Sequence, residues 1–238
     1  MNPPNLSIKL FADGAEIEGM LALARSGKVK GITTNPTLMR KAGISDYAGF
    51  ASQVLSQIKD LPISFEVFSD DLAGMEREAK AIAAWGQNVY VKVPVSNTAG
   101  QSTAPLIQSL AAAGVKLNVT AILTQRQVEQ VCAALKPGVP SIVSVFAGRI
   151  ADTGVDPEPM MRTALATCRK VAGAELLWAS TRELYNLFQA QRCGCDIITV
   201  THDILKKLDM VGKDLGELSL DTVKMFRSDA VAAGFKIG

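Results

Sequence analysis

The segment Asn88–Ser96 reads NVYVKVPVS, a short run of valines that ends at Pro94. A near-continuous apolar run of this length, rich in β-branched residues, predicts a strand buried on both faces, as in a parallel sheet. Lys92 lies in the middle of this run, where an ammonium group is costly unless it is paired. The segment therefore predicts a buried strand, Val89–Val93, and singles out Lys92 as a candidate functional residue.

Similar short apolar runs recur along the whole chain and alternate with amphipathic stretches. The other predicted strands are Ile8–Ala12, Gly31–Thr33, Ile63–Phe68, Lys116–Thr120, Ser141–Phe146, Glu175–Ala179 and Ile197–Val200. The predicted helices include Ala15–Ser26, Tyr47–Lys59, Met75–Ala84, Ser102–Ala113, Arg126–Leu135, Pro159–Ala172 and Arg182–Gln191. Asn35-Pro36 predicts a helix start, and Thr124–Gln127 and Ser180–Glu183 each fit a capping box.

Eight strand–helix units without a linker or a break in composition predict an α/β fold, a closed (β/α)8 TIM barrel. We expect one domain over residues 1–238, with the barrel at about 7–208 and a C-terminal helical extension at about 209–238. An open doubly wound sheet is the alternative. Its phosphate-binding G-x-G-x-x-G turn is missing from the first strand–helix connection, ADGAEIEG (Ala12–Gly19), which favours the barrel.

Composition excludes several classes of function. The formal net charge is +2 and aromatic residues make up 5% of the chain, so we expect neither nucleic-acid nor membrane partners. The chain contains one histidine, His202, which argues against most metal sites and favours a helix-start role for that residue. The four cysteines lack zinc-type spacing, and the N-terminal segment lacks the pattern of a secretory signal, so we expect a cytoplasmic protein.

Polar residues gather at the ends of the predicted strands. Glu66, Lys92, Asn118 and Ser144 are separated by 26 residues each time, which is one strand–helix unit per step. The full set is Asp13, Thr34, Asn35, Glu66, Lys92, Asn118, Thr120, Ser144, Ser180 and Thr201. In a barrel the carboxyl ends of the strands form the mouth where active sites lie, so these side chains should meet in one bowl.

Lys92 determines which chemistry a site at the strand ends can support. A lysine among apolar side chains loses hydration, which favours the neutral amine, and a neutral amine forms a Schiff base with a ketone. Glu66 and Asp13 are candidates for the proton transfers that this chemistry needs. The alternatives are an internal Lys92–Glu66 ion pair, a lysine that reaches solvent at the strand end, a simple turn at Asp13 and a simple helix cap at Asn35.

Arg149 and Arg182 follow the sixth and seventh predicted strands. A guanidinium group suits a phosphate oxygen pair, and Ser180 adds a donor beside it, so we predict an anion site there. The alternatives are two solvated loop arginines and a Ser180 that only caps the next helix.

Five motifs resemble those of the transaldolase family, in the short branch that also contains fructose-6-phosphate aldolases. They are GITTNPTLM (Gly31–Met39), VYVKVPVS (Val89–Ser96), LNVTAI (Leu117–Ile122), SVFAGRI (Ser144–Ile150) and ASTR (Ala179–Arg182). They agree in order and spacing from about residue 8 to the end of the chain. Two positions depart from the family's pattern: Gly14, where a hydroxyl residue is more common, and Val145, where many relatives have proline.

The resemblance implies a role for each candidate residue. Lys92 would be the Schiff-base lysine, Asp13 the acid/base at the scissile bond, and Glu66 with Thr120 would position a water molecule. The three-carbon dihydroxyacetone unit would be held by Asn35, Asn118 and Ser144, and the phosphate by Arg149, Ser180 and Arg182. No cofactor is implied.

Two positions indicate which activity of the branch to expect. The aldolases carry glutamine at the position of Glu66 and tyrosine at that of Phe146. Without a tyrosine hydroxyl to protonate the bound enamine, the enzyme should keep the three-carbon intermediate until an aldehyde acceptor arrives. Transfer is therefore favoured, while an aldolase that releases dihydroxyacetone, a transaldolase for sulfonated sugars and a non-catalytic sugar-phosphate binder stay open.

The last thirty residues predict a helix with an apolar stripe of Leu220, Val223, Phe226, Ala230 and Val231. Such a stripe needs a partner surface, either the chain's own barrel or a neighbouring subunit. Short-branch relatives assemble as rings of five, often paired into ten, so the resemblance implies a homo-oligomer, a pentamer or a decamer.

Overall fold

A computed structural model describes residues 6–237. Residues 1–5, the first part of the N-terminal segment assessed for a secretory signal, and residue 238 lie outside this range. The described chain forms two compact units, Leu6–Leu205 and residues 206–237, and each is described by itself.

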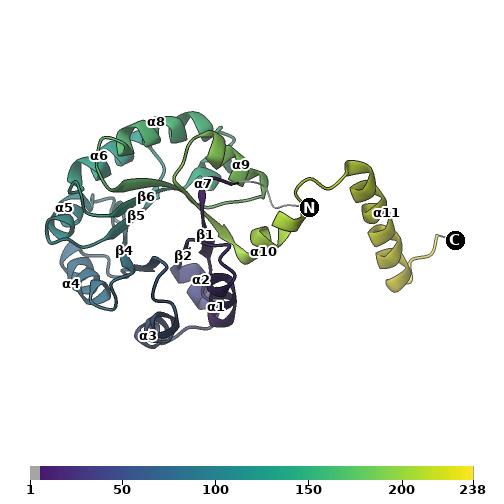
Figure 1. The fold of residues 1–238 in the computed structure, drawn as a ribbon, viewed down its shortest axis with the longest axis horizontal. Coiled ribbons are helices and arrows are strands. Elements are labelled where there is room, and N and C mark those ends of the chain that lie inside the picture. Colours follow the sequence, from purple (N-terminus) through teal and green to yellow (C-terminus); the bar gives the residue numbers. More distant parts are fainter. Residues whose placement is uncertain (1–5, 238) are drawn as a thin grey trace. The chain divides into compact units, whose positions relative to one another are not determined.

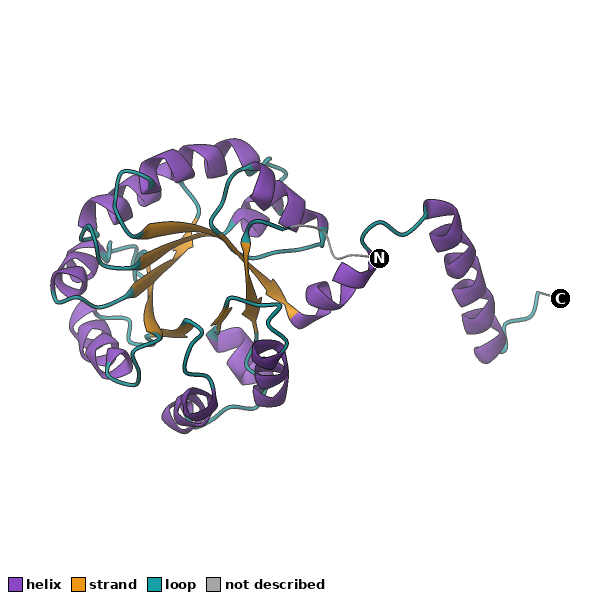
Figure 2. Cartoon of the chain, viewed as in Figure 1, coloured by secondary structure: helices purple, strands orange, loops and turns teal. Residues whose placement is uncertain are grey.

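Residues 6–205 form a closed barrel of eight parallel strands in the order β1 to β8, ringed by helices (Figure 1). The strands, orange in Figure 2, are β1 Lys9–Asp13, β2 Gly31–Thr33, β3 Ile63–Glu66, β4 Val89–Pro94, β5 Leu117–Ile122, β6 Ser141–Val145, β7 Ala174–Trp178 and β8 Ile197–Thr201. The barrel closes where β1 pairs with β8, from Lys9 opposite Ile197 to Asp13 opposite Thr201. The predicted TIM barrel is confirmed.

The helices are α1 Ile17–Arg25, α2 Pro36–Lys41, α3 Tyr47–Gln57, α4 Leu72–Ala83, α5 Ala104–Ala112, α6 Gln125–Ala134, α7 Ala147–Ala151, α8 Glu158–Cys168, α9 Tyr185–Arg192 and α10 His202–Leu205, followed by the 3-10 turn η1 Lys206–Met210 and by α11 Leu215–Ala232. None of the helices in the described range 6–237 has the length and apolar composition needed to cross a membrane.

Helix caps follow the sequence in two places and depart from it in a third. Asn35 caps α2 by accepting a hydrogen bond from Leu38 N–H, with Pro36 at the first helical position, and Thr124 forms a full capping box with Gln127. The capping box predicted at Ser180–Glu183 is wrong, because α9 begins only at Tyr185. Ser180 instead has a positive φ of 63°, which turns the chain directly after β7.

The register of the strands explains the 26-residue spacing. Glu66 lies opposite Lys92, and Lys92 lies opposite Asn118, so these three residues stand at one level of the barrel. Asn118 then lies opposite Ile142, which places Ser144 two residues further along β6. The register also shifts between Val119 and Ile122, where Ala121 has a φ of 61°. The expectation of equal heights therefore holds for three of the four residues.

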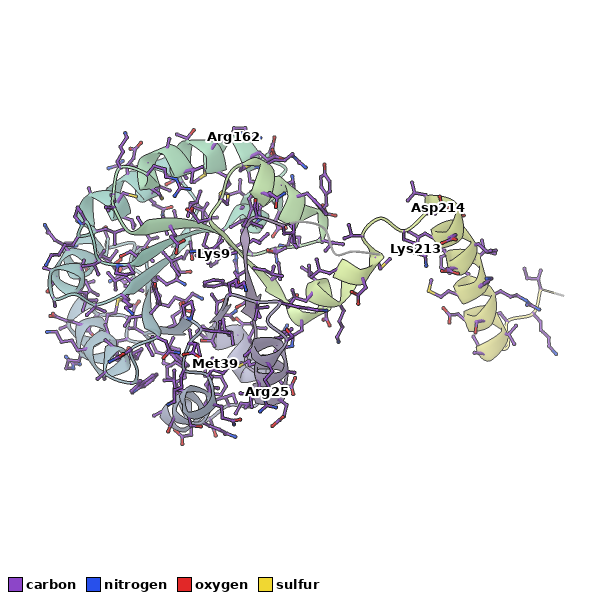
Figure 3. The ribbon with its side chains drawn as sticks, in the orientation of Figure 1. Lys9, Arg25, Met39, Arg162, Lys213 and Asp214 are labelled. Carbon is purple, nitrogen blue, oxygen red and sulfur yellow. The ribbon has the colours of Figure 1, made fainter. Side chains whose placement is uncertain are left out.

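The second unit contains α11, an amphipathic helix. Asp214 caps it by accepting hydrogen bonds from Gly216 N–H and Glu217 N–H, and Lys213 forms an ion pair with Asp221 on its second turn. Figure 3 labels Lys213 and Asp214 at the beginning of this helix. Among the described residues of α11 none is buried, and the side chains of Leu220, Val223, Phe226 and Val231 are 54% to 63% exposed.

Candidate active site

One cavity of about 380 Å³ lies at the carboxyl ends of the strands. All eleven predicted site residues line it: Asp13, Asn35, Glu66, Lys92, Asn118, Thr120, Ser144, Phe146, Arg149, Ser180 and Arg182. They come from the strands β1, β3, β4, β5 and β6 and from the segments that follow β2, β6 and β7. The strand ends thus bring together side chains that lie up to 169 residues apart in sequence, from Asp13 to Arg182.

Lys92 lines this cavity and is almost fully buried. It is 7% exposed, and its Nζ donates a hydrogen bond to the carbonyl oxygen of Thr34 at 2.9 Å. Its Nζ also lies 3.2 Å from Glu66 Oε2, as an ion pair. The predicted Lys92–Glu66 pair therefore forms, but it forms inside the cavity, where a ligand can reach both groups.

Asp13 lies at the end of β1 within a network of hydrogen bonds. Thr33 Oγ1 donates to Asp13 Oδ1 at 2.9 Å, and Asn35 Nδ2 donates to Asp13 Oδ2 at 3.2 Å. Burial nevertheless raises the pKa of Asp13 above its ordinary value, against the lowering effects of the charge on Lys92 and of these hydrogen bonds. A carboxyl group with a raised pKa is suited to accept a proton and then to return it.

Gly14, one of the two departures from the family's pattern, has a steric explanation. A side chain at this position would bring its Cβ to within 3.1 Å of His202 Nε2. His202 begins α10, as predicted for this residue, and its ring fills the space beside the Asp13-Gly14 turn. The glycine thus admits the imidazole without displacing the carboxylate.

Asn118 and Ser144 belong to a second network, on the floor of the cavity. Ser144 Oγ donates to Asn118 Oδ1 at 2.6 Å, and Asn118 Nδ2 donates to Ser64 Oγ at 2.9 Å. Because the amide is held at both ends, its orientation is fixed before a ligand arrives. Thr120 is different: its buried Oγ1 has no hydrogen-bond partner among the described residues, although it lines the cavity.

Arg149 and Arg182 lie on the opposite side of the cavity, beyond β6 and β7. The guanidinium of Arg149 lies 5.6 Å from the ring centre of Phe146, and Arg182 forms a two-point ion pair with Asp152 just after α7. The backbone of α7 at Gly148 packs directly against the backbone of Ser180. Only glycine permits this contact, because a Cβ at position 148 would lie 1.6 Å from the carbonyl oxygen of Ser180. Asp152 was not predicted from the sequence, since nothing local marks it as the partner of Arg182.

Other lining residues were also missed, among them Thr33 and Thr199. Thr199 Oγ1 lies 2.6 Å from Thr33 Oγ1, which extends the network around Asp13 to β8. Thr33 ends β2 beside Thr34, which was singled out, so the same rule could have found it. Thr199 lies in the middle of β8, where a rule based on strand ends does not apply. Residues 6–237 contain no cluster of His, Cys, Asp or Glu that could hold a metal ion.

Comparison with known proteins places this arrangement in context. A family model described as Transaldolase/Fructose-6-phosphate aldolase matches residues 10–237. A probable transaldolase from a Thermoanaerobacter species is 31% identical over 231 residues, which is 97% of this chain and 100% of the relative. A probable transaldolase from Methanococcus maripaludis is 33% identical over 206 residues, covering 84% of this chain and 89% of the relative.

Among solved structures, a putative dihydrodipicolinate synthase family protein from Coccidioides immitis has a similar fold, with a TM-score of 0.56. It is 13% identical, and the match covers 83% of this chain and 68% of that chain, so the likeness concerns the barrel alone.

Proposed function

The chain belongs to the transaldolase/fructose-6-phosphate aldolase family and is an enzyme of the aldolase/transaldolase type, and we propose that it is a transaldolase that works through a Schiff base on Lys92. It moves a dihydroxyacetone unit from a ketose phosphate to an aldose phosphate. The observation that carries the proposal is the placement of Lys92, whose Nζ lies 3.2 Å from Glu66 Oε2 in a cavity that Asp13 also lines.

In the first half of the reaction, Lys92 passes a proton to Glu66, its amine adds to the ketose carbonyl, and loss of water gives an iminium. Glu66 Oε2 lies next to Nζ, so it is the group that exchanges protons with the departing water. The hydroxyl of Thr120, which has no hydrogen-bond partner within residues 6–237, supports a water site in this part of the cavity.

In the second half, the carboxylate of Asp13 removes the proton from the hydroxyl group next to the scissile bond. The carbon–carbon bond breaks, its electron pair moves to the iminium nitrogen to give an enamine, and an aldose phosphate leaves. The enamine then attacks the carbonyl of an incoming aldose phosphate, and Asp13 returns its proton to the new hydroxyl. Water finally releases the product and regenerates the amine. The raised pKa of Asp13 favours its role as proton carrier.

Borohydride reduction in the presence of a ketose phosphate tests this proposal directly. We expect a covalent mass gain on the peptide that contains Lys92, and no gain on that peptide in Lys92→Met. A chain that binds the sugar phosphate without gaining mass would be a binder and not an enzyme of this mechanism. An assay for free dihydroxyacetone in the absence of an acceptor then separates cleavage from transfer.

Two variants should change the partition between transfer and cleavage. Glu66→Gln should lower transfer on the order of 10²-fold by removing a proton-transfer group. Phe146→Tyr should raise the release of free dihydroxyacetone, because the added hydroxyl can protonate the enamine. The measurement is the ratio of transferred to released three-carbon product. If both variants keep the parent's ratio, Glu66 and Phe146 do not decide between the two activities.

The two arginines should recognise the phosphate. Arg149→Ala and Arg182→Ala should each raise KM for phosphorylated substrates about ten- to a hundredfold, since a hydrogen bond to a charged group contributes about 1.5–3 kcal/mol. Unphosphorylated dihydroxyacetone should be affected less. Arg162, labelled on α8 in Figure 3, pairs with Glu158 and does not line the cavity, so Arg162→Ala is the matched control. Equal losses on both kinds of substrate would assign the arginines to the fold.

We also propose that α11 packs against a second copy of the chain, in a ring-shaped homo-oligomer. Its apolar residues Leu220, Val223, Phe226 and Val231 are more than half exposed, and an apolar stripe of this size is typical of an interface. The segment from residue 213 to the end should therefore be needed for assembly.

Truncation after Gly212 should dissociate the oligomer and reduce activity. Light scattering on the full chain and on the truncated chain measures the change in mass. A full chain that scatters as a monomer of its own mass, 25.3 kDa, at micromolar concentration would contradict the assembly.

A further inference from the structure

Tyr47, the first residue of α3, contacts the backbone of Glu66 through its hydroxyl group. Glu66 N–H donates a hydrogen bond to the Tyr47 oxygen at 2.6 Å, and the Tyr47 hydroxyl donates to Glu66 O at 3.1 Å. Both partner groups belong to the one residue of β3 whose side chain pairs with Lys92. A single phenol oxygen thus holds Glu66 at two points.

The topology of the barrel explains why these backbone groups need Tyr47. β2 ends at Thr33, whose partner on β3 is Ser64, so no strand residue lies opposite Glu66 on that side. The chain turns away after Thr33, because Asn35 caps α2. Backbone groups that are withdrawn from water need a partner, and the Tyr47 hydroxyl serves where the neighbouring strand is too short.

The ring of Tyr47 is itself held in place. Its centre lies 4.6 Å from that of Phe68, 5.5 Å from that of Trp85 and 6.0 Å from that of Phe65. Asp46 caps α3 by accepting a hydrogen bond from Gly49 N–H, which fixes the backbone at the start of the helix. Burial raises the pKa of Tyr47 above its ordinary value, so the hydroxyl keeps the proton that it donates.

We propose that Tyr47 is a positioning residue for Glu66. It fixes the end of β3 so that the Glu66 carboxylate stays beside Nζ of Lys92, at the distance that proton exchange with the carbinolamine requires. This role rests on the proposed function, because that function defines the task of Glu66. Tyr47 itself does not line the cavity.

Tyr47→Phe removes the hydroxyl and keeps the ring contacts. We expect kcat to fall about tenfold, as for a lost hydrogen bond at a group that must stay aligned, while KM changes less than about twofold. Tyr90→Phe is the matched control. It removes the same atom from β4 two residues before Lys92, and Tyr90 does not line the cavity, so kcat and KM should both stay at the wild-type values.

A double-mutant cycle separates positioning from general support of the fold. If Tyr47 acts through Glu66, then Tyr47→Phe should cost no further activity in a chain that already carries Glu66→Gln. Losses that multiply in the double variant would overturn the proposal. So would a Tyr47→Phe variant that loses thermal stability but keeps the wild-type kcat.

Hydrogen exchange of the wild-type chain tests the contact without any variant. The Glu66 amide should exchange slowly, and an amide that exchanges as fast as one in an exposed loop would overturn the proposal even if Tyr47→Phe does not fold. Borohydride trapping on the same wild-type preparation keeps the two proposals apart. If no adduct forms at Lys92, the proposed function is wrong; if the adduct forms and the losses multiply, only the role of Tyr47 is wrong.

Discussion

Replacing Lys92 with methionine should reduce turnover to the background rate while the chain still binds its substrates. Methionine is similar in length and apolar, so it suits a site that is 7% exposed among valines, but it has no nitrogen to attack a carbonyl. Arg149 and Arg182, for which phosphate binding is proposed, also line the cavity and are unchanged in this variant. Calorimetric binding of a ketose phosphate and a coupled transfer assay measure the two quantities separately.

The matched control is Lys116→Met. Lys116 precedes β5 and donates to Gln87 O at 2.6 Å, outside the cavity, so its loss should leave turnover unchanged. Even a few per cent of the wild-type rate in Lys92→Met would end the Schiff-base proposal, because no other lysine lines the cavity in the described part of the chain.

Replacing Asp13 with asparagine should lower transfer by about 10²- to 10⁴-fold, the usual contribution of a positioned acid/base. The same change should alter the pH dependence of stability. Burial raises the pKa of Asp13 above its ordinary value of 3.8. The contribution of Asp13 to the free energy of unfolding is therefore most favourable below pH 3.8, and it is lost as the pH rises through the raised pKa. Asparagine does not ionise, so the stability of the variant relative to wild type should increase with pH.

Urea unfolding at acidic and at neutral pH measures this change. Asparagine also loses the hydrogen bond from Asn35, which favours the charged carboxylate, but the net pKa of Asp13 is raised in spite of this bond, so its loss does not reverse the expected trend. Asp70→Asn is the control with the opposite sign. Hydrogen bonds from the side chain and backbone of Thr98 lower the pKa of Asp70, so removing its charge should cost more stability above its ordinary pKa than below it. If the free energies of unfolding of wild type and Asp13→Asn change with pH in parallel, the pKa of Asp13 is not raised in the folded chain.

The sequence predicted most of the barrel because each strand is a separate apolar run between clear turn residues. The sequence also predicted the cavity residues. The carboxyl ends of all the parallel strands lie at one face of the barrel, so polar residues at the ends of the apolar runs lie close together there. The limits follow from contacts between distant residues. The offset of Ser144 depends on the pairing of β5 with β6, in which Asn118 lies opposite Ile142, and the end of β2 at Thr33 leaves the backbone of Glu66 to the Tyr47 hydroxyl. Neither pattern is visible in a window of sequence.

The predicted capping box at Ser180 also failed because contacts between distant residues decide the conformation there. Its residues fit a local rule, yet the close approach of Gly148 to the Ser180 carbonyl holds this loop in a different conformation. Tertiary packing overrode the local preference, and it did so at a residue that lines the cavity together with Arg149 and Arg182.

The pairing of β1 with β8 has a consequence for the synthesis of the protein on the ribosome. Asp13 is made with the first strand of the barrel, but Thr201, opposite it on β8, is made 188 residues later. At about 5–20 residues per second, one edge of β1 waits on the order of ten seconds or more for its strand partner. During that interval the nascent chain carries an unpaired parallel edge, which is open to pairing with other chains. The first strand of the barrel therefore carries a residue of the candidate active site, and that site can be completed only after the last strand, β8, has been translated.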